Sequence, residues 1–161
     1  MEWISVPSPI GPLGVAADDS TVRAVRFGGP GRPAQPPGGN PLLARAAAQF
    51  DEYFAGVRTE FDLPLPDPGG TGFERAVWAA IAAIPYAEMA TYGALATQVG
   101  APDGARAVGV ACNRNPLPIV VPCHRVVGAG GKLVGFGGGL ARKRYLLELE
   151  ARVGIERAFR S

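Results

Sequence analysis

The chain has 161 residues, of which 47% are hydrophobic and 19% charged, a composition that favours a packed globule and excludes wholesale disorder. The net charge of +2 is unevenly divided: residues 1–70 hold 5 Lys and Arg against 8 Asp and Glu, and residues 71–161 hold 11 against 6. A basic second half is compatible with a polyanionic partner and equally with an ordinary solvated surface.

The sequence predicts neither a membrane-spanning segment nor a secretory signal. No apolar run approaches the ~20 residues of a membrane span. The start, MEWISVPSPIGPLG, lacks the basic region and apolar core of a secretory signal. We therefore expect a cytoplasmic protein with no membrane partner, in which both cysteines are reduced thiols.

The first 68 residues predict a small mixed α/β domain. Apolar stretches at 3–6, 13–15 and 22–27, with the turn signal Asp18-Asp19-Ser20, predict short antiparallel strands. Residues 28–41 contain ten Gly or Pro in fourteen and predict a flexible loop.

A helix and a last strand complete this predicted domain. Residues 42–56 place Leu and aromatic side chains near one helical face, and the helix stops at Gly56. Phe61, Leu63 and Leu65 alternate as a short strand before a PDPGG boundary at residues 66–70.

The second half predicts a mostly helical domain over residues 71–155, with 156–161 as a tail. Thr71 and Glu74 form a capping box for a helix that runs to about Ile84. Thr91 caps a second helix over 92–99, and Pro102 begins a third that reaches about Cys112. Two short helices joined by a tight Gly-containing turn are typical of a helix-turn-helix.

The third helix is unusually rich in small residues, and Arg106 is its only basic residue. Close packing against a neighbouring helix explains such a face without any function. A helix that reads the major groove projects several long polar side chains. If this one contacts DNA, we expect shape and backbone contacts with a single long probe.

The segment 118-PIVVPCHRVVGAGG-131 carries the strongest chemical signal. Ile119–Val121 predict a buried strand, and Pro122 predicts a bend after it. Cys123 and His124, the only histidine, follow at once, and imidazole can take the proton of a thiol whose pKa is near 8.5. A buried structural Cys beside a chance His remains open. Two Cys and one His without CxxC make a zinc site improbable, so we expect no metal.

Several motifs together resemble the O6-alkylguanine-DNA alkyltransferases, which are methylated-DNA–protein-cysteine methyltransferases. They are NPLPIVVPCHRV (115–126), GFGGG (135–139) and LARKRYLLELE (140–150), preceded in order by residues 73–96 and 104–116. The resemblance covers about 71–150 strongly and the first 70 residues in general plan. It implies an α/β (α+β) protein with a ribonuclease H-like first domain and a winged helix-turn-helix-like second domain.

The resemblance implies a single-turnover repair reaction without a cofactor. Double-stranded DNA with alkylated bases would bind at the minor groove, and the damaged guanine would be flipped into a pocket. A cysteine thiolate would then take the alkyl group irreversibly. A monomer is expected to act, and whether it binds cooperatively along DNA stays open.

The resemblance also implies roles for individual residues. Cys123 is the acceptor, His124 takes its proton through a water, and Glu150 orients the imidazole. Asn115 braces the turn, and Tyr92 donates to the leaving guanine. The carbonyls of Cys123 and Val126 read the guanine amino group, the Gly137 amide lies near the guanine oxygen, and Arg106 fills the space of the flipped base. The remaining expected substrate and DNA contacts are Ala105, Gly109, Arg114, Arg125 and Phe136.

Each of these residues also has an ordinary interpretation. Glu150 could pair with Arg142 or Lys143 on the surface, and Arg106 could be a solvated basic residue. The GFGGG segment (135–139) departs from the family pattern. Phe136 stands where Tyr is common, and Gly137 stands where some members have a hydroxyl side chain. Cys112 is expected on the pocket side of its helix, and we predict that it is not alkylated.

Three other functions compete. A damage sensor of the alkyltransferase-like kind lacks an acceptor cysteine, whereas Cys123 is present here. A transcription factor would need more polar side chains on the third helix. A cysteine hydrolase would turn over many times.

Overall fold

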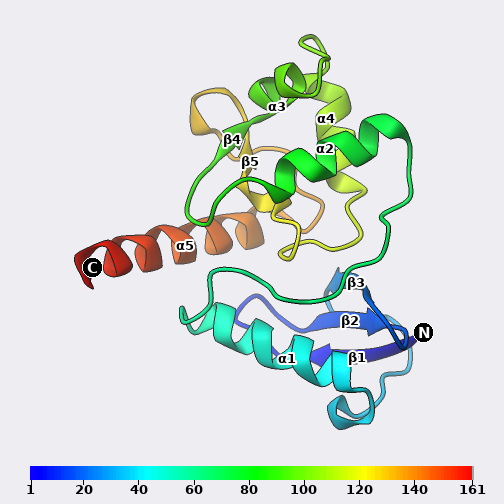
Figure 1. Cartoon of the computed structure of the whole chain (residues 1–161). Coiled ribbons are helices and arrows are strands. Elements are labelled where there is room, and N and C mark those ends of the chain that lie inside the picture. The colour runs from blue at the N-terminus through cyan, green and yellow to red at the C-terminus, as the bar shows by residue number, and fades with distance from the viewer. Residues whose placement is uncertain (161) are drawn as a thin grey trace. The chain divides into compact units, whose positions relative to one another are not determined.

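The computed structural model describes residues 1–160, without the side chain of Pro37; the chain divides into two compact units, Met1–Pro68 and Gly69–Ser161. Each unit has its own architecture (Figure 1). The secondary structure matches the mixed α/β class predicted from the sequence, with the three-stranded sheet in the first unit and most helices in the second.

The first unit is a three-stranded antiparallel sheet with one helix packed on it (Figure 1). Its strands are β1 (Glu2–Val6), β2 (Leu13–Ala17) and β3 (Val22–Phe27), in that order. α1 (Pro41–Phe54) begins at Asn40, whose side chain accepts from the Leu42 amide. All five residues of β2 are buried, as expected for a central strand covered by a helix. A short 3₁₀ turn, η1 (Pro37–Gly39), lies in the Gly/Pro-rich loop.

The strand predicted at residues 61–65 is wrong, because this segment has no regular secondary structure. Pro64 and Pro66 supply no amide donor, so a continuous ladder cannot form there. The side chain of Gln49 replaces the missing partner strand: its amide donates to the Asp62 carbonyl at 2.9 Å and its oxygen accepts from the Asp62 amide at 2.9 Å.

The second unit is built on three helices, α2 (Gly72–Ala82), α3 (Tyr92–Gln98) and α4 (Ala105–Asn113). The capping box predicted for Thr71 and Glu74 is present at the start of α2. Thr91 caps α3 as predicted, since its hydroxyl accepts from the Ala94 amide at 3.0 Å. The indole of Trp78 donates to the Ala111 carbonyl at 2.8 Å and fixes α2 against α4.

α4 begins later than the sequence predicts. The Gly104 amide donates to the Ala101 carbonyl at 2.7 Å, so Pro102 and Asp103 form a turn and not the first helical turn. Pro102 fits the second position of such a turn as well as the start of a helix, because both need its fixed φ.

A two-stranded parallel sheet ties the Cys-His segment to α3. β4 (Ala90–Thr91) pairs with β5 (Val126–Val127), with Ala90 opposite Val126. β4 leads directly into Tyr92, and β5 follows directly after a 3₁₀ turn, η2 (Cys123–Arg125). This pairing brings Tyr92 and Cys123 into one neighbourhood although 31 residues separate them.

The chain before Cys123 is not the buried strand that its valines suggest. Ile119 has φ of 74°, which breaks any extended run, and the Val121 amide turns back to the Leu117 carbonyl at 2.8 Å. The segment is a compact turn with buried Leu117 and Ile119. β propensity was overridden here by tertiary context.

The last element is a single long helix, α5 (Leu140–Arg160), preceded by the 3₁₀ turn η3 (Ala129–Gly131). Residues 156–160, expected as a tail, continue this helix, and Ser161 lies outside the described residues. Across residues 1–160, no helix combines the length and apolar character that a bilayer crossing requires.

Candidate active site

Cys123 is held by a tight backbone turn at Pro122. With φ of −81° and ψ of 64°, Pro122 has the inverse γ-turn conformation, and the Cys123 amide donates to the Val121 carbonyl at 2.8 Å. Asn115 supports the same turn, because its side chain donates to the Val121 carbonyl at 2.8 Å. Its oxygen accepts from the Leu117 amide at 2.9 Å, which leaves the Asn115 side chain little freedom.

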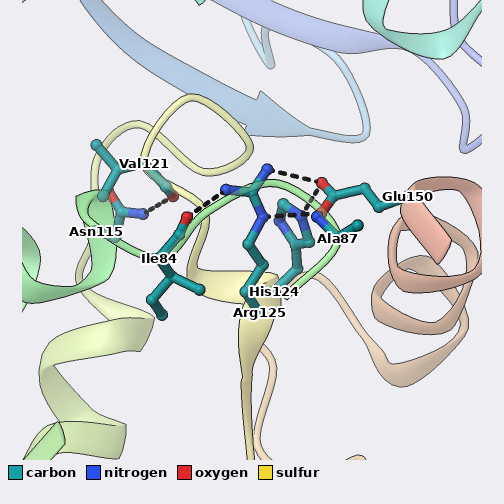
Figure 2. A network of polar contacts seen from close by, with 7 residues as sticks. All are labelled: Ile84, Ala87, Asn115, Val121, His124, Arg125 and Glu150. Atoms are coloured by element: carbon teal, nitrogen blue, oxygen red, sulfur yellow. Dashed lines mark hydrogen bonds and ion pairs between the residues drawn. The ribbon is translucent and has the colours of Figure 1, made fainter. Parts of the chain in front are cut away.

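A buried polar network joins Glu150 to His124 and Arg125, the two residues that follow Cys123 in the sequence (Figure 2). Nε2 of His124 is 2.7 Å from Oε2 of Glu150. Arg125 donates to the same carboxylate, through Nε to Oε1 at 2.8 Å and through an Nη atom to Oε2 at 3.1 Å. A further Arg125 donor reaches the Ile84 carbonyl at 2.7 Å, and the Ala87 amide donates to Oε1 of Glu150 at 3.2 Å.

The network defines the protonation of His124. Burial pushes the pKa of Glu150 upward, but the hydrogen bond from His124 and the hydrogen bonds and charge of Arg125 outweigh it and hold this pKa at about 2. Glu150 is therefore ionised at neutral pH and accepts the Nε2 proton of His124. Burial lowers the pKa of His124, against the hydrogen bond to Glu150, so the imidazole is neutral with its lone pair on Nδ1.

Nδ1 of His124 is thus the atom of this network that is available to accept a proton. His124 is fully buried, and among the described residues this nitrogen has no hydrogen-bond partner. A buried neutral imidazole with a free lone pair, oriented by a carboxylate, has the form of a general base beside a nucleophile.

Cys123 itself is buried, with 5% of its surface exposed. Burial raises the pKa of its thiol, and the Asn115 side chain, the Lys143 charge and nearby backbone amides lower it. The thiol is therefore protonated at rest and needs a base to become a nucleophile.

A cavity of about 620 Å³ is lined in part by residues of α3 and α4. Its wall includes Tyr92 from α3 and Arg106, Gly109 and Asn113 from α4. The Tyr92 ring lies against Gly109, whose Cβ position would be 3.8 Å from the ring, so the small residue of α4 lets the aromatic ring approach. Burial raises the pKa of Tyr92 to about 12, with further increases from the charges of Cys112 and Cys123.

The glycine-rich segment 134–139, which we call the glycine loop, borders this cavity. The Tyr92 hydroxyl donates to the carbonyls of Val134 and Gly135 at 3.2 and 3.0 Å. The Gly137 amide donates to Oδ1 of Asn113 at 3.1 Å. Side chains of α3 and α4 thus hold the glycine loop at two points.

Lys143 is a buried cation between the glycine loop and the two thiols. It has no exposed surface, and its Nζ donates to the Val134 carbonyl at 3.0 Å. Nζ lies 5.6 Å from the centre of the Tyr92 ring. Burial lowers the pKa of Lys143, and the charges of Cys112 and Cys123 raise it. A thiolate formed at either cysteine would therefore be attracted by this ammonium.

Comparison with known proteins agrees with this geometry. The family described as "6-O-methylguanine DNA methyltransferase, DNA binding domain" matches residues 72–152, and the one described as "6-O-methylguanine DNA methyltransferase, ribonuclease-like domain" matches residues 1–66. The chain belongs to the 6-O-methylguanine DNA methyltransferase family.

Individual relatives match over almost the whole chain. A methylated-DNA–protein-cysteine methyltransferase of Mycobacterium leprae is 51% identical, covering 91% of this chain and 90% of its own. One from Methanosarcina acetivorans is 44% identical, covering 93% and 98%. The Mycobacterium tuberculosis OGT structure in complex with DNA has a TM-score of 0.83 at 44% identity and covers 95% and 94%. The resemblance drawn from the sequence motifs is confirmed at the level of family and fold.

The structure brings most of the residues expected from the resemblance into one unit of this methyltransferase. Tyr92, Ala105, Arg106 and Gly109 line the cavity. Val126 follows the Cys-His-Arg turn, and its amide donates to the Cys123 carbonyl, which is one of the two carbonyls expected to read the base. Phe136 is partly buried against the core of the second unit.

Two arginines expected at the DNA have partners within the protein. Arg125 is 7% exposed and its guanidinium binds Glu150 and Ile84, which corrects the expectation of a DNA contact. The sequence also suggested Arg142 or Lys143 as an ordinary surface partner for Glu150, whereas Glu150 is buried and bound by Arg125. Arg114 is mostly exposed and lies 3.6 Å from a carboxylate oxygen of Glu74.

Sequence reasoning missed Arg125 as a partner of Glu150, Lys143 as a site residue, and Asn113 as a contact of the glycine loop. A buried Lys within an otherwise amphipathic helix gives no local signal that separates it from its neighbours Arg142 and Arg144. In residues 1–160, no group of three or more His, Cys, Asp or Glu side chains is arranged to hold a metal ion.

Proposed function

We propose that this protein repairs O6-alkylguanine in double-stranded DNA by transferring the alkyl group irreversibly to Cys123. Family membership supports the reaction class, since the relatives are named methylated-DNA–protein-cysteine methyltransferases. The observation that carries the assignment of the acceptor is the position of Cys123 on the same 3₁₀ turn as His124 and Arg125, both of which bind the buried Glu150 of α5.

The reaction starts with proton transfer from the Cys123 thiol to Nδ1 of His124, through one water molecule. The thiolate then attacks the alkyl carbon in line, a carbon–sulfur bond forms, and the carbon–O6 bond breaks with its electron pair on guanine. The proton released from the thiol neutralises the guanine anion. The thioether product has no route back to a free thiol, so each chain acts once.

The residues around the cavity bind and position the base. The flipped guanine occupies the cavity, and Tyr92 donates to it as its negative charge develops. The Gly137 amide bonds to the guanine oxygen, the carbonyls of Cys123 and Val126 accept from its amino group, and Arg106 fills the gap in the duplex. Asn115 keeps the Cys123 turn in place.

Lys143 joins this site as an electrostatic residue. A buried ammonium near a thiol favours the thiolate, because opposite charges in a low-dielectric site attract strongly. Lys143 therefore offsets part of the burial that raises the pKa of Cys123.

The remaining parts of the proposal concern organisation. Residues 71–155 carry DNA binding and alkyl transfer, and residues 1–68 form a separate domain. All proposed catalytic residues come from one chain, so a monomer suffices, and cooperative binding along DNA is tested by the shape of a titration. A cytoplasmic location keeps Cys123 reduced.

A single-turnover assay tests the proposal. Duplex DNA with a labelled methyl on guanine O6 is mixed with wild type, Cys123→Ala and the matched control Cys112→Ala. Cys112 is buried, and burial with the Cys123 charge raises its pKa to about 12, so its thiol is unreactive.

We expect label on wild type and Cys112→Ala, ending near one methyl per chain, and none on Cys123→Ala. Label on Cys123→Ala would identify another acceptor. Lesion binding without transfer would make the protein a damage sensor, and repeated turnover would make it a hydrolase.

A further inference from the structure

The Gly137 amide is engaged within the protein at the position where the proposed function needs it free. Asn113 is the last residue of α4, and its Oδ1 accepts from the Gly137 amide at 3.1 Å. Because the backbone N–H can only donate, the side-chain atom that faces it must be the oxygen of Asn113. The amide carries one hydrogen, so two acceptors cannot both bond it with good geometry.

We propose that Asn113 is a positioning residue that stands in for the guanine oxygen: its carboxamide holds the Gly137 amide in the free protein and releases it when the flipped base arrives. This inference rests on the proposed function, in which that amide bonds to O6. Asn113 belongs to the wall of the cavity that would receive the base, so its oxygen and that of the base compete at one edge of it.

The surrounding contacts hold the glycine loop while this amide changes its acceptor. Lys143 donates to the Val134 carbonyl, so the start of the glycine loop keeps an anchor that depends neither on Asn113 nor on the Tyr92 hydroxyl, which turns to the base in the proposed function. At the end of the loop, the Gly139 amide donates to the Phe136 carbonyl at 3.0 Å. The Asn113 bond is exposed and neutral, so its loss shifts the equilibrium between the bonded and the free Gly137 amide by only about fivefold.

The first test measures amide–solvent exchange of Gly137 by NMR in the full chain labelled with ¹⁵N. Cys123→Ala serves as the background, because it cannot accept a methyl group, and Asn113→Ala is added to it. Both proteins are measured free and with duplex DNA carrying O6-methylguanine.

In the free state we expect exchange about fivefold faster in the Asn113→Ala protein, because the amide has lost its acceptor. With the duplex bound we expect equal rates, because the base oxygen has replaced Asn113. Equal rates in the free proteins, or a difference that persists in the complex, would each overturn the proposal.

The second test uses two substitutions of Asn113 and the free base O6-methylguanine, which has no phosphate to be repelled by a new carboxylate. Asn113→Ala removes the competing acceptor, and Asn113→Asp makes it stronger, because a carboxylate accepts more strongly than an amide. We expect transfer to Cys123 about fivefold faster in the first and slower than wild type in the second.

A residue needed only for stability would slow transfer in both variants, and that result would overturn the proposal. Failure of the proposed function is separate, because wild type would then transfer no methyl group from the duplex. Transfer by wild type with none of the Asn113 effects would refute this inference alone.

Discussion

The two sides of the candidate active site are held by different kinds of interaction. On one side, the side chains of His124, Arg125 and Glu150 are buried and joined by charged hydrogen bonds of 2.7 to 3.1 Å. On the cavity side, the glycine loop is held by neutral, exposed bonds from Tyr92 and Asn113, and Lys143 adds one charged bond at its start. Charged buried groups are costly to rearrange, whereas exposed neutral bonds exchange easily. The His124–Arg125–Glu150 network is thus preorganised, and the exposed bonds of the cavity side are adaptable.

The largest expected effect comes from Glu150→Gln. The variant keeps the shape of the side chain but leaves the buried Arg125 without its counter-charge, so the free energy of unfolding should fall by about 3–5 kcal/mol. Transfer should be lost, because His124 is no longer held with its proton on Nε2. Urea denaturation and the methyl-transfer assay measure the two effects.

The double variant Glu150→Gln/Arg125→Met provides the control for that prediction. Removing the unpaired charge should recover part of the lost stability without recovering transfer. A double variant less stable than Glu150→Gln would show that Arg125 contributes mainly through packing and the Ile84 contact.

Acid unfolding should reveal the same carboxylate. The pKa of Glu150 falls from 4.5 to about 2 on folding. A group with a depressed pKa stabilises the fold fully above its unfolded value and loses that contribution as pH falls through the folded value. Wild type should therefore lose on the order of 3 kcal/mol between about pH 4.5 and pH 2 that Glu150→Gln does not lose. Parallel curves for the two proteins in urea titrations across this range would contradict the assignment.

Lys143→Met tests the proposed electrostatic effect of Lys143 on the Cys123 thiol. The side chain keeps most of its volume and loses its charge, so the pKa of Cys123 should rise and transfer at neutral pH should slow about tenfold. Arg144→Met, an exposed position on the same helix, is the matched control and should transfer at the wild-type rate. A rate of Lys143→Met that matches wild type at every pH would remove Lys143 from the site.

The smallest expected change in stability comes from Tyr92→Phe. It removes the bonds to the Val134 and Gly135 carbonyls, which are exposed, so the free energy of unfolding should fall by less than about 1 kcal/mol. Thermal denaturation compared with Glu150→Gln checks this contrast. A loss as large as that of Glu150→Gln would show that the cavity side is as preorganised as the proton-transfer side.

Features that depend on neighbours in the chain were determined by the sequence itself. The capping box of Thr71 and Glu74, the cap at Thr91 and the adjacency of Cys123 and His124 all lie within a few residues, so the pattern alone indicates them. The motifs over residues 71–150 also sufficed to identify the family.

Only the tertiary structure decided which distant groups meet. Propensity predicts strands at 61–65 and 119–121, but prolines in the first and a positive φ at Ile119 in the second give other conformations. The pairing of Arg125 with Glu150, the burial of Lys143 and the contact between Asn113 and Gly137 each join residues at least 24 positions apart or bury a charge. Their energies depend on packing and on exclusion of water, and neither can be read from local pattern.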